Sequence, residues 1–269
     1  METPVTTFRE MHRPGDPFVL ANAWDMGSAR VLAAMGAKAI ATTSAGFAFT
    51  RGVGDGGIVR RAEAIAHAAE LAGATPLPVS ADLEDGYGPE PADAAETVRQ
   101  AALAGLAGCC IEDVDGEGAP YAHAAAVARI ENAAVAARAA PADFVLCARA
   151  DGVMHGAYDL GEAIARLNAF REAGADVLYA PVPGSAEDLR RLVGAVGGAV
   201  NALAVGPLAK LSLADFAEIG VARVSLGSAL ARATHRALIE AGGAMLGGDF
   251  AARGAPGAEV DALLAKGAG

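Results

Sequence analysis

The sequence predicts a single α/β domain of the (β/α)8 class, a TIM-type barrel. Eight short apolar segments alternate with longer alanine-rich helical segments, a pattern typical of repeated strand–helix units. At several junctions a glycine follows the helix and the next strand begins at once, so we expect that glycine to cap the helix. The length of 269 residues suits one complete barrel, and the count of eight favours a closed barrel over an open sheet.

The predicted strands are short apolar runs, and several follow a helix-ending glycine, as in AAMGAKAI and EAGADVLYA. Helical segments follow each strand in turn, which predicts a parallel sheet. The strands are Phe18–Leu20, Ala39–Thr42, Leu77–Ala81, Gly108–Ile111, Phe144–Ala148, Val177–Ala180, Ala199–Leu203 and Arg223–Ser225. The helices are Gly27–Met35, Arg60–Leu71, Pro91–Ala104, Tyr121–Ala139, Leu160–Ala173, Ala186–Val193, Leu213–Ile219 and Ala229–Ala241.

The C-terminal part of the chain differs in character from the barrel. No linker divides the chain, so we expect the barrel to span residues 1–241 and an extension to span residues 242–269. The extension is rich in glycine and lacks apolar periodicity until Glu259–Lys266. Two interpretations stay open, an appended helix that makes oligomer contacts and a loose end.

The bulk composition excludes several classes of partner. Apolar residues make up 53% of the chain, which indicates a large buried core rather than disorder. The net charge of −11 would repel polyanions, so neither nucleic acid nor an anionic membrane is an expected partner. An acidic protein that binds a small anion needs a local cation, which points to a metal ion or a well-placed arginine.

The sequence also predicts a cytoplasmic protein. Residues 1–15 contain no apolar segment of the kind that a signal peptide requires. The most apolar stretch, Leu192–Ala209, is interrupted by a proline and several glycines, so it does not suit a membrane span. An odd number of cysteines fits a reducing compartment, and we interpret the adjacent Cys109 and Cys110 as small core residues.

Polar residues collect where the predicted strands end. In a barrel of this class the carboxyl ends of the strands carry the chemistry, because they meet at one rim. The sequence places several carboxylates and one arginine around that rim. The residues are Trp24, Asp25, Thr42, Thr43, Ser44, Asp82, Glu84, Asp85, Glu112, Asp113, Arg149 and Asp151.

Asp82 and Glu84 are the most informative of these residues. They lie two apart, so in an extended chain their side chains point to the same side, where a shared cation would relieve their repulsion. Ligands that are all oxygen suit Mg²⁺, with Mn²⁺ as the alternative, and Glu112 from the adjacent strand could complete the site directly or through water. Taken singly, each acid could instead cap a helix or lie in a loop, but three acids on neighbouring strand ends favour the metal site.

Arg149 directly follows an apolar strand. From this position it could bind a substrate carboxylate through a bidentate fork, and the alternative is a structural ion pair with Glu112 or Asp151. Trp24, the only tryptophan, is interpreted as a hydrophobic plug beneath a loop. The segment from Thr43 offers backbone N–H groups and hydroxyls that suit a carboxylate.

Five motifs occur in order along the chain, namely NAWDMGSARVLAAMGAKAIATTSAG, GVGDGG with its lone aspartate, SADLEDGYG, CIEDV and CARADG. Together they resemble the isocitrate lyase/phosphoenolpyruvate mutase superfamily, from about Ala21 to Ala233. The chain is most similar to the short members described as 2-oxocarboxylate lyases or phosphonomutase-like proteins. The resemblance implies a barrel, a small 2-oxo acid substrate and homotetramers that swap a C-terminal helix.

The resemblance also implies roles for individual residues. Asp82 and Glu84 match the acidic pair that binds Mg²⁺, although many members have aspartate at the second place. Glu112 matches an acid that acts at the metal directly or through water. The expected catalytic residues are thus Arg149, Glu112 and Asp55, the last being the acid that follows the substrate-binding loop. The expected substrate-binding residues are Trp24, Thr43, Ser44, Ala45 and Arg149.

The loop after the fourth predicted strand departs from the lyases of this superfamily. Those enzymes carry a Lys-Lys-Cys-Gly-His run there, whose cysteine acts as acid or base, whereas this chain reads DVDGEGAPYAH. The difference argues against cleavage of isocitrate or methylisocitrate. Candidates for proton transfer are Glu117, Tyr121 and His123, although an exposed position early in a helix is the favoured interpretation of His123. His155 could line the pocket, and a loop histidine without a catalytic role is the equal alternative.

We therefore expect a Mg²⁺-dependent lyase that acts on a small 2-oxo carboxylic acid, through an enolate of the pyruvate type. Carbon–carbon cleavage, decarboxylation and phosphorus–carbon cleavage share that enolate. The alternatives kept open are a phosphonopyruvate hydrolase or phosphonomutase-like enzyme, a barrel that binds a 2-oxo acid without converting it, and a Mg²⁺-dependent aldolase or hydroxymethyltransferase.

Overall fold

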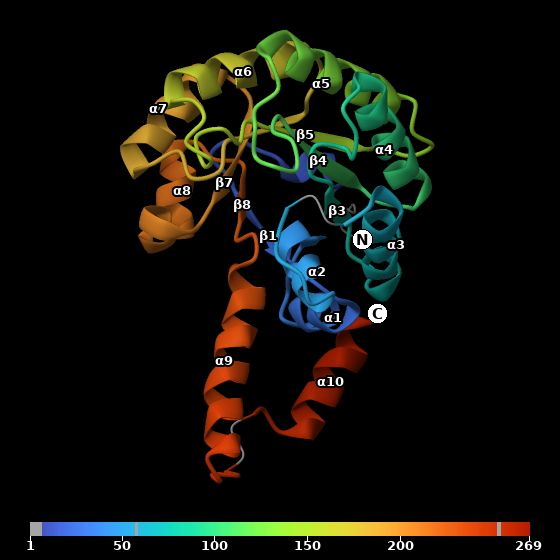
Figure 1. The fold of residues 1–269 in the computed structure, drawn as a ribbon, viewed down its shortest axis with the longest axis vertical. Helices are drawn as coiled ribbons and strands as arrows, with labels where there is room; N and C mark the ends of the chain where they lie inside the picture. The colour runs from blue at the N-terminus through green and yellow to red at the C-terminus, as the bar shows by residue number, and fades with distance from the viewer. Residues whose placement is uncertain (1–6, 57–58, 252–253) are drawn as a thin grey trace, which may run out of the picture.

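The computed structural model describes residues 7–56, 59–251 and 254–269, and its sheet is a closed barrel of eight parallel strands in sequential order (Figure 1). The predicted fold class is confirmed, and each predicted strand occurs within two residues of its expected bounds. The strands are β1 (Phe18–Asn22), β2 (Ala39–Ala41), β3 (Val79–Asp82), β4 (Gly108–Glu112), β5 (Val145–Arg149), β6 (Val177–Tyr179), β7 (Ala199–Leu203) and β8 (Arg223–Ser225).

Helices follow the strands and surround the barrel, as predicted. The described residues also form two 3₁₀ helices, η1 (Arg9–Met11) and η2 (Gly206–Lys210). The helices are α1 (Met26–Ala34), α2 (Ser44–Thr50), α3 (Arg61–Ala74), α4 (Pro91–Leu103), α5 (His123–Arg138), α6 (Leu160–Glu172), α7 (Ala186–Val196), α8 (Leu213–Ile219), α9 (Ala229–Leu246) and α10 (Gly257–Gly267).

Helix α2 was not predicted, because its sequence is short and contains glycine, phenylalanine and threonine, which favour helix weakly. Tertiary contacts hold it instead. The Phe47 ring stacks on the His67 ring of α3 at a centroid distance of 3.8 Å. Thr43 caps the helix by accepting a hydrogen bond from the Gly46 N–H. Strand β2 accordingly ends at Ala41, one residue earlier than expected.

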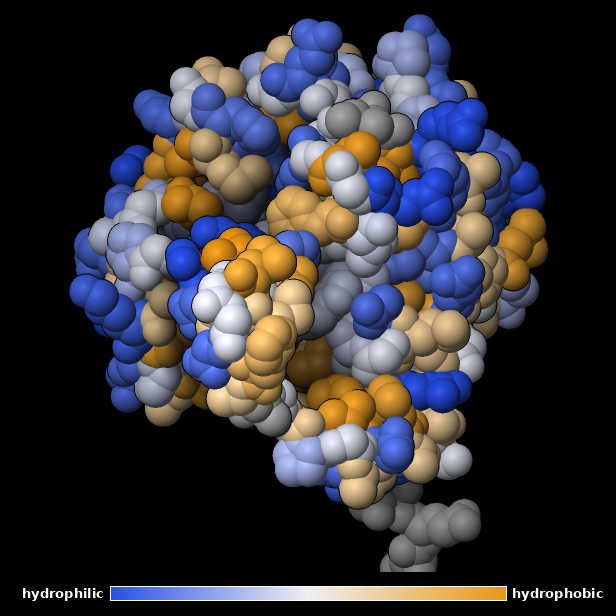
Figure 2. Space-filling model, turned by 60° about the horizontal axis from the view of Figure 1, so that its bottom comes forward, coloured by the Kyte–Doolittle hydropathy of each residue, from blue (hydrophilic) through white to orange (hydrophobic). Residues whose placement is uncertain are grey.

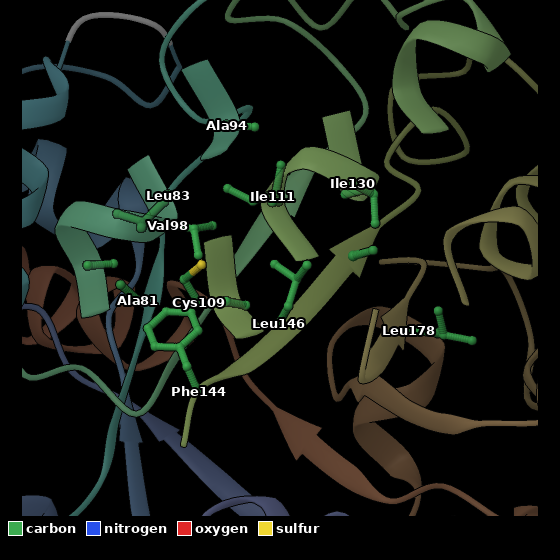
Figure 3. Packing of buried hydrophobic residues seen from close by; sticks show 14 of the residues in the cluster. Ala81, Leu83, Ala94, Val98, Cys109, Ile111, Ile130, Phe144, Leu146 and Leu178 are labelled. Carbon is green, nitrogen blue, oxygen red and sulfur yellow. The ribbon is translucent and has the colours of Figure 1, made fainter. Parts of the chain in front are cut away.

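The hydrophobic core lies between the barrel and its helices. Strand residues that face outward, among them Ala81, Ile111 and Leu146, pack against α4 and α5, where Figure 3 shows them beside Val98 and Ile130. A smaller apolar group fills part of the barrel interior, from Phe18 at the start of β1 to Tyr179 at the end of β6.

The C-terminal segment forms an arm. Helix α9 extends away from the barrel, and α10 returns to pack on α1 (Figure 1). A side chain at Gly267 would overlap the carbonyl of Arg30, so α10 docks closely. Exposed apolar side chains gather along the arm, including Leu246 and Phe250, and hydrophobic patches mark the face that Figure 2 turns forward. The helix expected near residues 259–266 is present, whereas the division at residue 241 and the oligomer contact stay predictions.

Two expectations from the sequence concern a membrane span and a signal peptide. None of the helices in the described part of the chain has the length and apolarity that crossing a bilayer requires. The expectation that residues 1–15 hold no signal peptide falls partly on residues 1–6, which lie outside the described residues.

Candidate functional site

Two adjoining cavities open at the carboxyl ends of the strands. The first, about 160 Å³, runs from the rim into the barrel as far as Arg223. The second, about 270 Å³, lies under the loop that follows β4. Ser44, Asp55, Arg149 and Met154 line both cavities. The walls of the two cavities also include the predicted residues Thr43, Ala45, Asp82, Glu84 and Glu112.

Arg149 lies at the centre of the site and contacts three carboxylates. Its Nη1 is 2.9 Å from Asp82 Oδ1 and 2.7 Å from Glu112 Oε1. Its Nε and Nη2 donate to the two oxygens of Asp151, at 3.1 and 2.6 Å. The bidentate fork is therefore used on Asp151, which matches the structural alternative considered for this arginine. Only the Nη1 side faces the cavity acids.

Asp82 ends β3 and accepts hydrogen bonds on both carboxylate oxygens. Its Oδ2 accepts from the Ser44 N–H and hydroxyl, at 3.1 and 3.0 Å. Its Oδ1 accepts from Arg149 and from the Cys110 thiol at 3.4 Å. The interpretation of Cys110 as a core residue was therefore wrong, since its side chain lines the first cavity, whereas Cys109 is fully buried as expected.

Glu84 does not continue an extended chain beyond Asp82. Its φ of 47° lies in the left-handed region, so the backbone turns there and the expected side-by-side geometry was wrong. The turn brings the Glu84 carbonyl to within 2.8 Å of the Glu112 N–H, which donates to it. The loops after β3 and β4 are thereby joined at the positions of two predicted metal ligands.

The electrostatics of the site favour a bound cation. Burial, above all, raises the pKa of Glu112 well above its ordinary value, and neighbouring Asp151, Asp82 and Glu84 add to the shift while Arg149 opposes it. Burial and the Asp82 charge likewise raise the pKa of Asp55. Three carboxylates thus contact the Arg149 guanidinium, and Asp55 and Glu84 line the adjoining cavities. Their excess charge and all-oxygen donor set fit a hard divalent ion.

The described carboxylates of the site do not surround a common position that could hold an ion. Among the described residues, no three carboxylate, imidazole or thiol groups are arranged to hold a metal ion. The reason is visible in the ion pairs, because Asp82 and Glu112 both face Arg149. The chemistry of the donors therefore fits Mg²⁺, while the side chains must exchange part of their contact with Arg149 to hold it.

Buried polar contacts beneath the rim fix the loops that cover it. Asp113, which had no predicted role, accepts hydrogen bonds from the Asp151 N–H, the Tyr158 hydroxyl and Arg166 at 2.7–3.0 Å. Asp85 accepts from the Tyr121 hydroxyl at 2.6 Å. These contacts tie the loops after β3, β4 and β5 to one another.

The remaining predicted residues fall into two groups. Glu117 and His155 both line the second cavity, as expected for His155, and Glu117 stays a candidate for proton transfer. Tyr121 is bound to Asp85, and His123 is exposed at the start of α5, where it contacts Glu162. Trp24 packs against α2, since a side chain at Gly46 would come within 2.9 Å of its Cβ. It lines neither of the two cavities.

Sequence reasoning missed the floor of the first cavity. Asn201, Ser225 and Arg223 lie there, on β7 and β8. A usable signal was present, because an asparagine inside the apolar strand AVNAL is unusual. Asn22, at the end of β1, lines the same cavity and accepts hydrogen bonds from the Leu226 and Gly227 N–H groups.

The chain matches the family described as phosphoenolpyruvate phosphomutase over residues 8–246. It is 37% identical to a Mycobacterium tuberculosis protein of undetermined function over 261 residues, which cover 96% of each chain. It is 30% identical to the 2,3-dimethylmalate lyase of Eubacterium barkeri over 192 residues, 68% of this chain and 65% of the lyase.

Solved structures agree. A Burkholderia cenocepacia protein assigned to the lyases or mutases is 45% identical, with a TM-score of 0.90 over 97% of this chain and 95% of that one. A 2,3-dimethylmalate lyase structure is 28% identical, with a TM-score of 0.85 over 98% and 95% of the two chains. The chain therefore belongs to the phosphoenolpyruvate phosphomutase family, within the isocitrate lyase/phosphoenolpyruvate mutase superfamily of lyases and mutases.

Proposed function

We propose that the protein is a Mg²⁺-dependent lyase that cleaves a carbon–carbon bond at C3 of a small 2-oxo carboxylic acid, or decarboxylates it. The observation that carries the proposal is the group of buried acids around Arg149 at the mouth of a small cavity. Asp82 and Glu84 would hold the ion, with Glu112 directly or through water. When bound, the ion supplies an electrophile for the ketone oxygen.

The protein's own groups have complementary tasks in this proposal. Ser44 and Ala45 line the cavity beside Asp82, where hydroxyl and backbone N–H groups can orient the substrate carboxylate. Arg149 Nη1 stabilises negative charge that develops on the substrate. The loops after β4 and β5 meet beside the second cavity, since a side chain at Gly118 would overlap the His155 ring. Glu117 and His155 are the proposed groups for moving a proton at C3.

A phosphorus–carbon bond enzyme is the second candidate. The loop after β4 carries neither the lysines nor the cysteine expected of the lyases, and the matching family is described as a phosphomutase. Cleavage of a phosphonate at C3 would pass through the same enolate. Phosphate release from phosphonopyruvate, or its conversion to phosphoenolpyruvate, would favour this candidate over the lyase.

A substrate panel with Mg²⁺ tests both candidates. Oxaloacetate, substituted malates, methylisocitrate and phosphonopyruvate are incubated with the enzyme, and pyruvate is detected. Asp82→Ala and Glu84→Ala should each weaken Mg²⁺ binding by calorimetry, whereas Glu187→Ala, at an exposed site on α7, should not. Absence of pyruvate from every compound would count against the lyase, and unchanged metal affinity in both variants would count against the ion site.

We further propose that the chain assembles into a homotetramer through its C-terminal arm. The exposed apolar residues of α9, which include Leu238, Ile239 and Leu246, support a partner surface there. Light scattering coupled to size exclusion measures the assembly directly. A monomer at micromolar concentration would contradict the proposal.

A further inference from the structure

The floor of the first cavity contains a buried arginine whose contacts are all neutral. Arg223 begins β8 and is 4% exposed. Its Nε donates to Asn201 Oδ1 at 2.8 Å, and its Nη2 donates to Cys147 Sγ at 3.2 Å. Its Nη1 lies 3.2 Å from His12 Nε2. None of these partners is a carboxylate.

The other buried arginines of the described chain each have an acidic partner. Arg149 pairs with Asp151, Arg166 pairs with Asp113, and Arg129 lies 3.7 Å from Asp85. Within the described residues, no ion pair includes Arg223. Because a buried charge without a counter-charge is costly, the surroundings of Arg223 call for an anion.

The two groups beside Arg223 that could ionise do not supply that anion. Burial and the Arg223 charge lower the pKa of His12 to about 3, so its ring is neutral. The Phe8 carbonyl contacts His12 Nδ1, which leaves Nε2 to accept from the guanidinium. Burial raises the pKa of the Cys147 thiol, so it stays protonated.

The floor also offers a second donor toward the cavity. Asn201 Nδ2 donates to Ser225 Oγ at 2.9 Å, so the Ser225 hydroxyl accepts there and keeps its own hydrogen to donate. Asn201 thereby orients both Arg223 and Ser225, since its carbonyl oxygen accepts from the guanidinium. All three residues line the cavity that opens at the rim.

We propose that Arg223 and Ser225 form an anion site on the cavity floor, oriented by Asn201, which takes one carboxylate or an anion of halide size. This site lies deeper in the barrel than the acids that surround Arg149. Two sources share this chemistry. One is a free anion from solution, and the other is a second acidic group of the substrate, which rests on the proposed function.

Bromide is a direct probe of the site. Crystals soaked in bromide should show an anomalous peak beside the Arg223 guanidinium, and the peak should be absent from Arg223→Met. In solution, a given concentration of bromide should raise the Tm of the wild-type protein more than that of Arg223→Met. A wild-type structure without the peak, together with an equal rise in Tm for the two proteins, would overturn the proposal.

A second variant keeps the test valid if Arg223→Met does not fold. Ser225→Ala should raise the bromide concentration needed for half of the Tm shift by about 10-fold, the loss of one charge-assisted hydrogen bond. Ser228→Ala is the matched control, because Ser228 lines the same cavity near the rim. An equal response of Ser225→Ala and the wild-type protein would contradict the role given to Ser225.

Steady-state kinetics separate the two sources. Bromide that competes with the 2-oxo acid indicates that an acidic group of the substrate uses the floor site. Bromide that binds without competition indicates a resident anion from solution. The crystallographic and Tm measurements need no turnover, so failure of the proposed function would leave the anion site standing and its own failure would be seen separately.

Discussion

The Arg149 guanidinium contacts one fully buried acid and two acids that face the cavity. Asp151 is fully buried and takes the bidentate fork, so this pair holds the arginine in place. Asp82 and Glu112 share the remaining Nη1 and face the cavity. A cation that entered between these two acids would replace Nη1 as their partner. That nitrogen would then be released to bind the substrate.

Replacing Arg149 with methionine should cost about 3–5 kcal/mol in the free energy of unfolding, because Asp151 would remain buried without its cation. Urea denaturation measures this loss. Adding Asp151→Asn to the Arg149→Met protein should recover part of it, since the second change removes the unpaired charge. Equal stability of Arg149→Met and the wild-type protein would show that the pair contributes nothing.

Replacing His12 with glutamine should flatten the pH dependence of stability in acid. The folded-state pKa of His12, about 3, lies below its ordinary 6.5, so between these values the unfolded chain binds the proton and the folded chain does not. The free energy of unfolding therefore rises with pH through this window and is lost as pH falls. His12→Gln should reduce the slope by about 1.4 kcal/mol per pH unit between pH 4 and 6.

Urea titrations at intervals of half a pH unit measure that slope. Glutamine can still accept from Arg223, so the variant should keep its fold. The slopes of the two proteins should coincide between pH 7 and 8, which is the internal control. Parallel curves at pH 4–6 would contradict a neutral, partly buried His12.

The positions of individual site residues were predictable where the residue directly follows a predicted strand. Asp82, Glu112 and Arg149 reached the rim as expected, because a residue that follows a buried strand of a barrel lies there. Their partners were not predictable, since the fork of Arg149 could take Glu112 or Asp151 on sequence grounds alone. The position of Arg223 was missed because its neighbours come from β5, from β7 and from His12, which follows η1.

Among the secondary-structure elements, α2 depends on tertiary packing, whereas the others follow from their local sequence. The eight strands and the longer helices follow from periodicity and from glycine at the helix ends. Helix α2 has seven residues and weak propensity, and it exists because Phe47 stacks on His67 and Gly46 packs against Trp24. No window of sequence contains those contacts.

Replacing Gly46 with alanine should push α2 away from Trp24. The new Cβ would lie 2.5 Å from Thr43 Cγ2 and 2.9 Å from Trp24 Cβ, an overpacking that costs about 1–3 kcal/mol in the free energy of unfolding. Because α2 carries Ser44, the KM for the 2-oxo acid should rise more than kcat falls. Thermal unfolding and steady-state kinetics measure the two effects.

Gly73→Ala is the matched control for that substitution. Gly73 lies in α3 with no neighbouring atom within 4 Å of an added Cβ, so alanine should stabilise the helix by about 0.5–1 kcal/mol. Its kinetic constants should equal those of the wild-type protein. A Gly46→Ala protein that behaved like Gly73→Ala would show that an added Cβ fits between α2 and Trp24.

For the molecule as a whole, the arm of α9 and α10 contacts the barrel through the first half of α9, where the His235 ring meets the Phe49 ring of α2, and through the packing of α10 on α1. Such an element can detach without unfolding the barrel. Periodicity indicated the final helix, whereas its return to α1 depends on a close backbone approach at Gly267 that sequence does not reveal.

Replacing Gly267 with alanine should release α10. An added Cβ would overlap the Arg30 carbonyl, whereas Gly257→Ala, at the start of the same helix, meets nothing within 4 Å. Hydrogen exchange should accelerate in α1 and α10 of Gly267→Ala and stay unchanged in β1 to β8. Unaltered exchange in α1 would mean that the arm is held elsewhere.

Asp113 lies between the buried contacts of the rim and the hairpin that follows β4. The short hairpin that begins with Val114 and closes at Pro120 is held at its base by this buried carboxylate and its three donors. A hairpin anchored in that way can be lengthened or rewritten at its tip while the acids below keep their positions. Replacing this one short segment should therefore change the groups that line the second cavity without displacing the acids beneath it.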